Sequence, residues 1–197
     1  MKKTAIFAGS LLILFTATAQ QAHFGLKGGV NISQLHFDNN TPSDSKVGVN
    51  LGILAHIHAS KTWAIQPELL YSLEGAQKVG NSGINYNLNY LNVPVLLQYM
   101  FDNVFRVEGG PQIGFLLNAK RKAGDVTVDD NGFRTTAFSI PLGVGYLTSS
   151  GVGLDARYVF GVSNINDSEN GPIIQSNVFQ LGLFYQLSDS KIHSHHR

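Results

Sequence analysis

The residues best suited to chemistry in this sequence are seven charged side chains that recur among glycines, asparagines and glutamines. In each surrounding segment polar residues alternate with apolar ones, so a strand would place the charges on one face. Both signs are present, and an unpaired charge in a narrow space is very costly. We predict a buried ion-pair network that plugs the interior; the alternative is a narrow polar pore lined by the same side chains. They are Lys27, Glu68, Glu74, Arg106, Glu108, Asp155 and Arg157.

Two histidines form a second candidate site. His56 and His58 are two residues apart, so they share a strand face, and Glu68 lies on the next predicted strand. Imidazole nitrogens act as general bases and as transition-metal ligands. The spacing dictates no third ligand, and the chain has no Ser nucleophile motif, P-loop or HExxH sequence. We therefore expect no catalytic site, no resident metal and no cofactor, and predict that the protein is not an enzyme.

The formal charge of the chain is close to neutral, with 14 Lys and Arg residues against 13 Asp and Glu. This balance gives no reason to expect nucleic acid as a partner. The chain has no cysteine, so its stability must come from packing and backbone pairing.

Residues 1–19 have the pattern of a secretory signal peptide. Two lysines precede an apolar run, and small residues follow it. The run is shorter than the roughly 20 residues of a membrane-spanning helix, so we predict cleavage after Ala19. The remainder is predicted to form a folded domain at 20–187 and a disordered polar tail at 188–197, which contains three histidines.

Eight later segments alternate between apolar and polar residues, as strands with one apolar face do. Each has roughly 10 residues or more, the length that a tilted strand needs to cross a membrane. We expect no transmembrane helix, because polar residues interrupt every longer apolar run. The segments are residues 23–35, 47–59, 63–73, 84–99, 104–118, 138–146, 152–160 and 179–187.

The connections between these segments alternate in length. Three are short, and four are long and polar, which matches the short periplasmic turns and longer external loops of outer-membrane barrels. We therefore predict an all-β fold, an eight-stranded antiparallel up-and-down transmembrane β-barrel. The short turns are residues 60–62, 102–103 and 148–150, and the long loops are residues 36–46, 75–83, 119–134 and 163–176.

The apolar face is predicted to contact lipid and the polar face to line the lumen. Only 14% of the chain is charged, which is low for a soluble exterior, and the polar face is rich in glycines that fit a narrow interior. Aromatic residues bound an aliphatic band at both ends, as lipid interfaces select. These aromatics include Trp63, Tyr71, Tyr99, Phe105, Phe115, Tyr146, Tyr158, Phe160 and Tyr185.

Two irregularities mark the predicted strands. Prolines inside strands remove ladder hydrogen bonds, so we interpret them as bulges or strand ends. Apolar residues also change parity within 84–99, which predicts a one-residue bulge near Tyr90. The prolines are Pro67, Pro94, Pro111 and Pro141.

Five segments distributed over the chain resemble the PorT-like outer-membrane β-barrel family, often labelled "porin family" proteins. The resemblance implies an eight-stranded barrel in the outer membrane of a Gram-negative bacterium, and it implies little about activity. This chain differs from the family's usual pattern at its last predicted strand, which ends in Leu187 rather than in an aromatic residue. The segments are FGLKGGVN, IQPELLYS, YLNVPVLLQY, VEGGPQIGF and LDARYVFGVSNI.

These observations together favour a structural or interaction role, with the lumen closed by the ion-pair network. The alternative is a narrow porin that passes small solutes or ions. The expected partners are outer-membrane lipid and lipopolysaccharide, the outer-membrane assembly machinery, and a protein or surface reached through the external loops.

Overall fold

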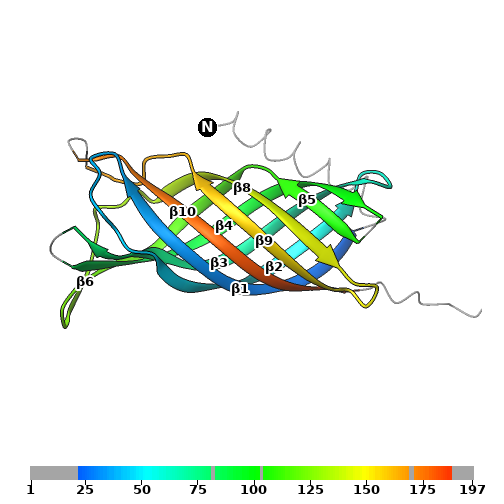
Figure 1. Ribbon diagram of the computed structural model, residues 1–197, viewed down its shortest axis with the longest axis horizontal. Helices are drawn as coiled ribbons and strands as arrows, with labels where there is room; N and C mark the ends of the chain where they lie inside the picture. The colour runs from blue at the N-terminus through cyan, green and yellow to red at the C-terminus, as the bar shows by residue number, and fades with distance from the viewer. Residues whose placement is uncertain (1–21, 81–82, 103, 169–170, 188–197) are drawn as a thin grey trace, which may run out of the picture.

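The computed structural model describes residues 22–80, 83–102, 104–168 and 171–187, which form one closed barrel (Figure 1). The predicted signal peptide and polar tail lie outside the described residues. Within them, no helix has the length and apolar character needed to cross a membrane. The strands are β1 (Ala22–Phe37), β2 (Lys46–His58), β3 (Trp63–Val79), β4 (Ile84–Phe101), β5 (Phe105–Gly109), β6 (Gln112–Ala123), β7 (Val126–Asp129), β8 (Thr136–Leu147), β9 (Val152–Gly161) and β10 (Ile174–Gln186).

The barrel wall consists of eight antiparallel strands, as predicted. Each strand pairs with its sequence neighbour, and β1 pairs with β10 to close the ring. β5 and β6 keep one register against both β4 and β8, so together they are a single wall strand interrupted at residues 110–111. β7 pairs with β6 as a short hairpin outside the ring.

The two ends of the barrel differ as the loop lengths predict. One end, the turn rim, has the connections 59–62, 102–104 and 148–151. In two of these turns, side chains bond the backbone: the Trp63 amide donates to Ser60 Oγ at 3.0 Å, and Thr148 Oγ1 donates to the Val152 carbonyl at 2.7 Å. The other end, the loop rim, has the longer connections 38–45, 130–135 and 162–173, one short connection between β3 and β4, and the β6–β7 hairpin, which projects beyond the wall (Figure 1).

Two of the predicted loops are largely strand. β3 continues to Val79, so that only residues 80–83 connect it to β4, and the predicted loop at 119–134 contains the β6–β7 hairpin. With 17 and 18 residues, β3 and β4 exceed the roughly 9–11 that cross a bilayer. Beyond the membrane the outward face of the barrel wall meets water, so exposed polar residues such as Gln77 and Lys78 are compatible with strand pairing there. The polar composition of these two segments therefore predicted loops where the chain continues as strand.

Three of the four in-strand prolines gather at one break in the wall. Pro111 separates β5 from β6, and Pro94 on β4 pairs with the first residue of β6. On the other side, the Pro141 carbonyl accepts a hydrogen bond from the Gly110 amide at 3.3 Å. This grouping confines the missing N–H donors to one place. The strand registers continue unchanged through Pro67 in β3, Pro94 in β4 and Pro141 in β8, so the predicted bulge or strand end is wrong at these three positions. Only Pro111 lies at a strand break.

The two faces of the wall have opposite character. Outward side chains are apolar and exposed, for example Leu51 at 67% and Leu154 at 56%, whereas lumenal Lys27 is 1% exposed. Lumenal glycines leave room for large side chains: a Cβ on Gly153 would lie 1.9 Å from the Phe184 ring. The interior is therefore narrow and filled, and the apolar face is the outer surface.

All nine aromatics predicted at the lipid interfaces lie on strand positions that face outward. At the turn rim they form a continuous band across four wall strands. Ring centroids are 5.0 Å apart for Trp63 and Tyr99 and for Phe105 and Tyr146, and Phe101 lies 4.8 Å from Tyr99. The remaining predicted residues are Tyr71, Phe115, Tyr158, Phe160 and Tyr185, which are each about 40% exposed.

Candidate functional site

Arg157 is at the centre of the lumenal charge network. Its Nη1 and Nη2 atoms donate to the two Glu68 carboxylate oxygens at 2.7 and 2.6 Å, and its Nε donates to Glu108 Oε1. Both carboxylates also accept an amide hydrogen bond at 2.6 Å, from Gln66 and Gln98. Arg157 is 2% exposed, so its hydrogen bonds to the two carboxylates are shielded from water. They link strand β9 to β3 and β5 across the lumen.

A second ion pair and an unpaired arginine complete the network. Lys27 Nζ lies 2.8 Å from Asp155 Oδ1 and 4.0 Å from Glu68 Oε2. Arg106 is buried with its guanidinium 4.3 Å from the Phe184 ring centroid, and its Nε and Nη2 have no hydrogen-bond partner among the described protein atoms. The network thus contains three bases and three acids, so its formal charge is zero.

Glu74, the seventh predicted member, lies in a separate polar layer closer to the loop rim. Its Oε1 accepts hydrogen bonds from Ser72 Oγ and Asn92 Nδ2, both at 2.9 Å, and Ser176 Oγ lies 3.3 Å from Oε2. Among the described residues no base forms an ion pair with it; Lys46 Nζ instead bonds the Glu74 backbone carbonyl at 2.9 Å. Sequence alone grouped Glu74 with the other charges because strand parity gives the face but not the height.

Above this polar layer an apolar cluster fills the lumen, which the sequence analysis missed. It includes Phe133 and Ile165, which belong to the connections on the loop rim and fold inward, and Leu88 and Tyr90 of β4. The apolar residues that change parity in β4 therefore face inward and belong to this cluster. The predicted bulge in β4 is wrong, because the register shift opposite Tyr90 falls in β6. The cluster also contains Leu35, Phe37, Ala76, Val79, Ala119 and Ile174.

The order of layers along the lumen follows from one strand. From the turn rim inward, β3 presents Glu68 to the ion pairs, then Leu70, then Ser72 and Glu74 to the polar layer, and then Ala76 to the apolar cluster. A solute crossing the barrel would meet a charged, a polar and an apolar barrier in succession. Breaking a dry ion pair or opening an apolar core is costly, so this arrangement favours closure.

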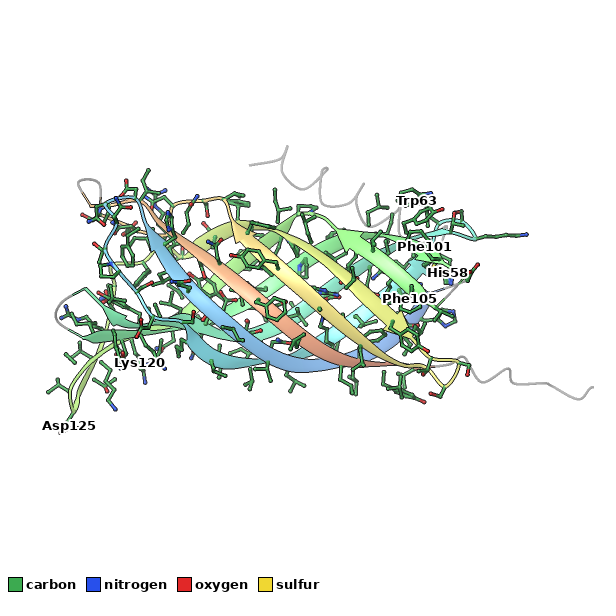
Figure 2. The ribbon with its side chains drawn as sticks, in the orientation of Figure 1. His58, Trp63, Phe101, Phe105, Lys120 and Asp125 are labelled. Atoms are coloured by element: carbon green, nitrogen blue, oxygen red, sulfur yellow. The ribbon has the colours of Figure 1, made fainter. Side chains whose placement is uncertain are left out.

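The predicted histidines lie at the turn rim, away from the charge network's ion pairs. His56 and His58 share the lumenal face of β2, with ring centroids 4.6 Å apart, and His23 of β1 pairs with His56 across the strands. All three line a vestibule of about 490 Å³. Figure 2 places His58 at the same end as Trp63 and Phe105. Glu68 is not among the residues that line the vestibule, so the structure does not bring it to the histidine pair.

The fold, the exposed apolar belt and the aromatic band at its turn-rim end define an integral outer-membrane β-barrel protein. The family model described as "Outer membrane protein beta-barrel domain" matches residues 18–167, which is more than half of the chain. The chain therefore belongs to this family, and its location is the bacterial outer membrane, with the turn rim toward the periplasm. No curated protein sequence matches the chain significantly.

Solved outer-membrane barrels share the fold at low sequence identity. Neisserial surface protein A (NspA) is 13% identical with a TM-score of 0.61, and the match covers 85% of this chain and 100% of that chain. Ail, the attachment invasion locus protein of Yersinia pestis, is 15% identical with a TM-score of 0.56 and the same coverage. A second structure of Ail, in complex with the heparin analogue sucrose octasulfate, is 14% identical with a TM-score of 0.53 and again has this coverage.

Proposed function

We propose that this protein is a non-conducting outer-membrane barrel with a structural or interaction role rather than a porin or an enzyme. The observation that supports this most strongly is closure of the lumen at two levels. The ion pairs around Arg157 and the apolar cluster around Phe133 are made by different residues, at different heights in the lumen, and by different forces. Loss of one barrier would leave the other in place.

The surface available to a partner is the hairpin of β6 and β7. All four residues of β7 are exposed, including Val126 at 66% and Val128 at 43%, and the hairpin lies beyond the wall at the loop rim. Lys120 and Asp125 mark it in Figure 2, at the end of the barrel opposite to Trp63. Its consecutive bases at 120–122 and exposed valines suit contact with a protein or a surface outside the cell.

The remaining interactions in this proposal follow from the barrel class. Lipid and lipopolysaccharide would contact the exposed apolar belt, and the outer-membrane assembly machinery would insert the chain. We also propose membership of the PorT-like subgroup, which the five quoted sequence segments support.

Ion flux into vesicles tests the closed lumen. Protein folded into vesicles that contain an ion-sensitive dye should admit no more ion than vesicles prepared without protein. A variant with serine at Glu68, Glu108 and Arg157, which removes the ion pairs of Arg157, should still show little flux because the apolar cluster remains. Flux through the wild type would instead support a narrow porin.

An external ligand is tested separately. Because Ail forms a complex with sucrose octasulfate, we would use this compound as the first probe of the basic hairpin. Binding that falls when residues 120–122 are changed to alanine would support an anionic surface partner. Binding unchanged by these substitutions would exclude the hairpin as the site.

A further inference from the structure

A groove of about 600 Å³ crosses the outer face of the barrel wall. It extends over β1, β10, β9, β8 and β5, which are adjacent in the wall (Figure 1). The large side chains that line it are apolar and exposed, for example Leu154 at 56% and Leu183 at 55%. The groove is therefore part of the apolar belt, and the closed lumen does not explain it.

One row of lining residues climbs from the turn rim toward the middle of the membrane. Phe105 is the first residue of β5 and belongs to the turn-rim aromatic band, whereas Gly28 is the seventh residue of β1. The stagger of the strands thus gives the groove a slope from the periplasmic interface into the hydrocarbon. In order of backbone pairing the row is Phe105, Tyr146, Leu154, Leu183 and Gly28.

The length and slope of this row match one leaflet of a membrane. A row across five strands that are about 4.8 Å apart is roughly 19 Å long. Strands of such barrels tilt by about 35–45°, so a row perpendicular to them covers roughly 11–13 Å of depth. One leaflet contributes about 15 Å of hydrocarbon. The groove therefore has the reach of a single lipid acyl chain.

The glycine at the inner end of the row is not required by the packing of the barrel itself. A Cβ on Gly28 would meet Leu51 Cδ1 at 3.5 Å, which is ordinary contact. At every other glycine of the described strands, an added Cβ would lie 2.8 Å or less from a neighbouring atom. Glycine inside a strand is unfavourable and often marks a close approach of a ligand to the backbone. Gly28 thus indicates a ligand on the outer face.

We propose that the groove binds one acyl chain of a phospholipid from the periplasmic leaflet. The proposal rests on the contact between lipid and the apolar belt, with which the groove is continuous. An empty hollow would forfeit dispersion contacts, so a hydrocarbon chain fills it. The phospholipid headgroup lies at the band of Phe105 and Tyr146, and its chain runs past Leu154 and Leu183 to Gly28. Lipopolysaccharide occupies the opposite leaflet, away from this end of the barrel.

A second copy of the chain is a poorer occupant of the groove. In a two-fold dimer both partners present the same surface, so one hollow would face the other and leave a void. An acyl chain is as apolar as leucine, and its flexibility lets it follow the hollow.

Photochemical cross-linking in vesicles tests where the lipid lies. Wild-type protein is folded into phosphatidylethanolamine vesicles that contain a phospholipid with a diazirine on its acyl chain, and cross-linked residues are mapped by mass spectrometry. Cross-links should concentrate on Leu154 and Leu183. Ile65 and Leu97 are the matched positions, because they are exposed, paired on β3 and β4, and outside the groove. Equal labelling of both pairs would overturn the groove proposal and leave lipid contact with the belt in place.

Substitutions that fill the hollow test the groove itself. Native mass spectrometry of the folded full-length protein with added phosphatidylethanolamine should show one retained lipid per chain. Gly28→Leu should lose this lipid, and so should Ala156→Leu, which fills an outward, partly exposed position in the groove. Ala55→Leu is the matched control and should retain the lipid, because Ala55 is an outward, partly exposed residue of β2 outside the groove.

Folding of each variant is checked by heat-modifiable migration on a gel. Equal retention of phospholipid by Ala156→Leu and Ala55→Leu would overturn the proposal. Preferential retention of lipopolysaccharide offered at the same concentration would also overturn it, and so would a dimer that retains no lipid. None of these results would affect the closed-lumen proposal, because the groove lies on the outer wall.

Discussion

Replacing Arg157 tests whether the lumenal ion pairs hold the barrel together. Arg157→Gln removes the partner of Glu68 and Glu108 and leaves three buried acids against two bases. Removing one member of a dry ion pair costs about 3–5 kcal/mol. The double variant Glu68→Gln with Arg157→Gln restores charge balance, so its loss should be smaller than the sum of the two single losses by roughly 0.5–3 kcal/mol.

The assay is urea unfolding of protein folded into vesicles. The chain has one tryptophan, Trp63, and its place in the turn-rim aromatic band makes its fluorescence a reporter of transfer out of the lipid interface. A loss of 3 kcal/mol shifts the midpoint by roughly 1–3 M urea for the usual range of slopes. Glu74→Gln is the matched control, because Glu74 forms no ion pair with a described base, and it should cost much less than Glu68→Gln.

Two outcomes would refute this reasoning. A loss below about 1 kcal/mol for Arg157→Gln would mean that the pairs are solvated and contribute as little as surface pairs do. Strictly additive losses in the double variant would mean that Glu68 and Arg157 do not interact energetically, despite the two hydrogen bonds that join them.

Three further substitutions probe other parts of the barrel. Gly153→Val should lower the unfolding free energy by about 1–3 kcal/mol or more, because its side chain would overlap the Phe184 ring; a simultaneous Phe184→Ala change should recover part of this loss in the urea assay. Phe133→Ala should remove about 3 kcal/mol from the apolar cluster and speed protease cleavage of the loop-rim connections, while flux stays at the background level. Tyr146→Ala should cost roughly 0.5–1.5 kcal/mol beyond its lost apolar area, because it loses its contact with Phe105; no change in the urea midpoint would argue against the aromatic band.

Alternation of side chains predicted the barrel well. β9 shows why: Val152, Leu154, Tyr158 and Phe160 are outside, and Asp155 and Arg157 are buried in the lumen as their parity requires. A strand offers only two faces, so the sequence pattern leaves little ambiguity. The alternating loop lengths likewise predicted which rim has the short turns.

Partners across the lumen could not be predicted in the same way. Arg157 meets Glu68 because the stagger of the strands brings them to one height, and stagger leaves no local sequence signal. Glu74 lies on the same face of β3 as Glu68, but it is further toward the loop rim and does not reach the ion pairs. Phe133 lies in a polar loop, and only its isolation among polar residues hinted that it folds inward.

The most direct test of the closed lumen is single-channel recording of the folded wild-type protein in a planar bilayer. We predict no current steps, because the ion pairs around Arg157 and the apolar cluster around Phe133 both block the path. Reproducible steps that disappear when bulky side chains replace lumenal glycines would contradict the account and identify a narrow pore.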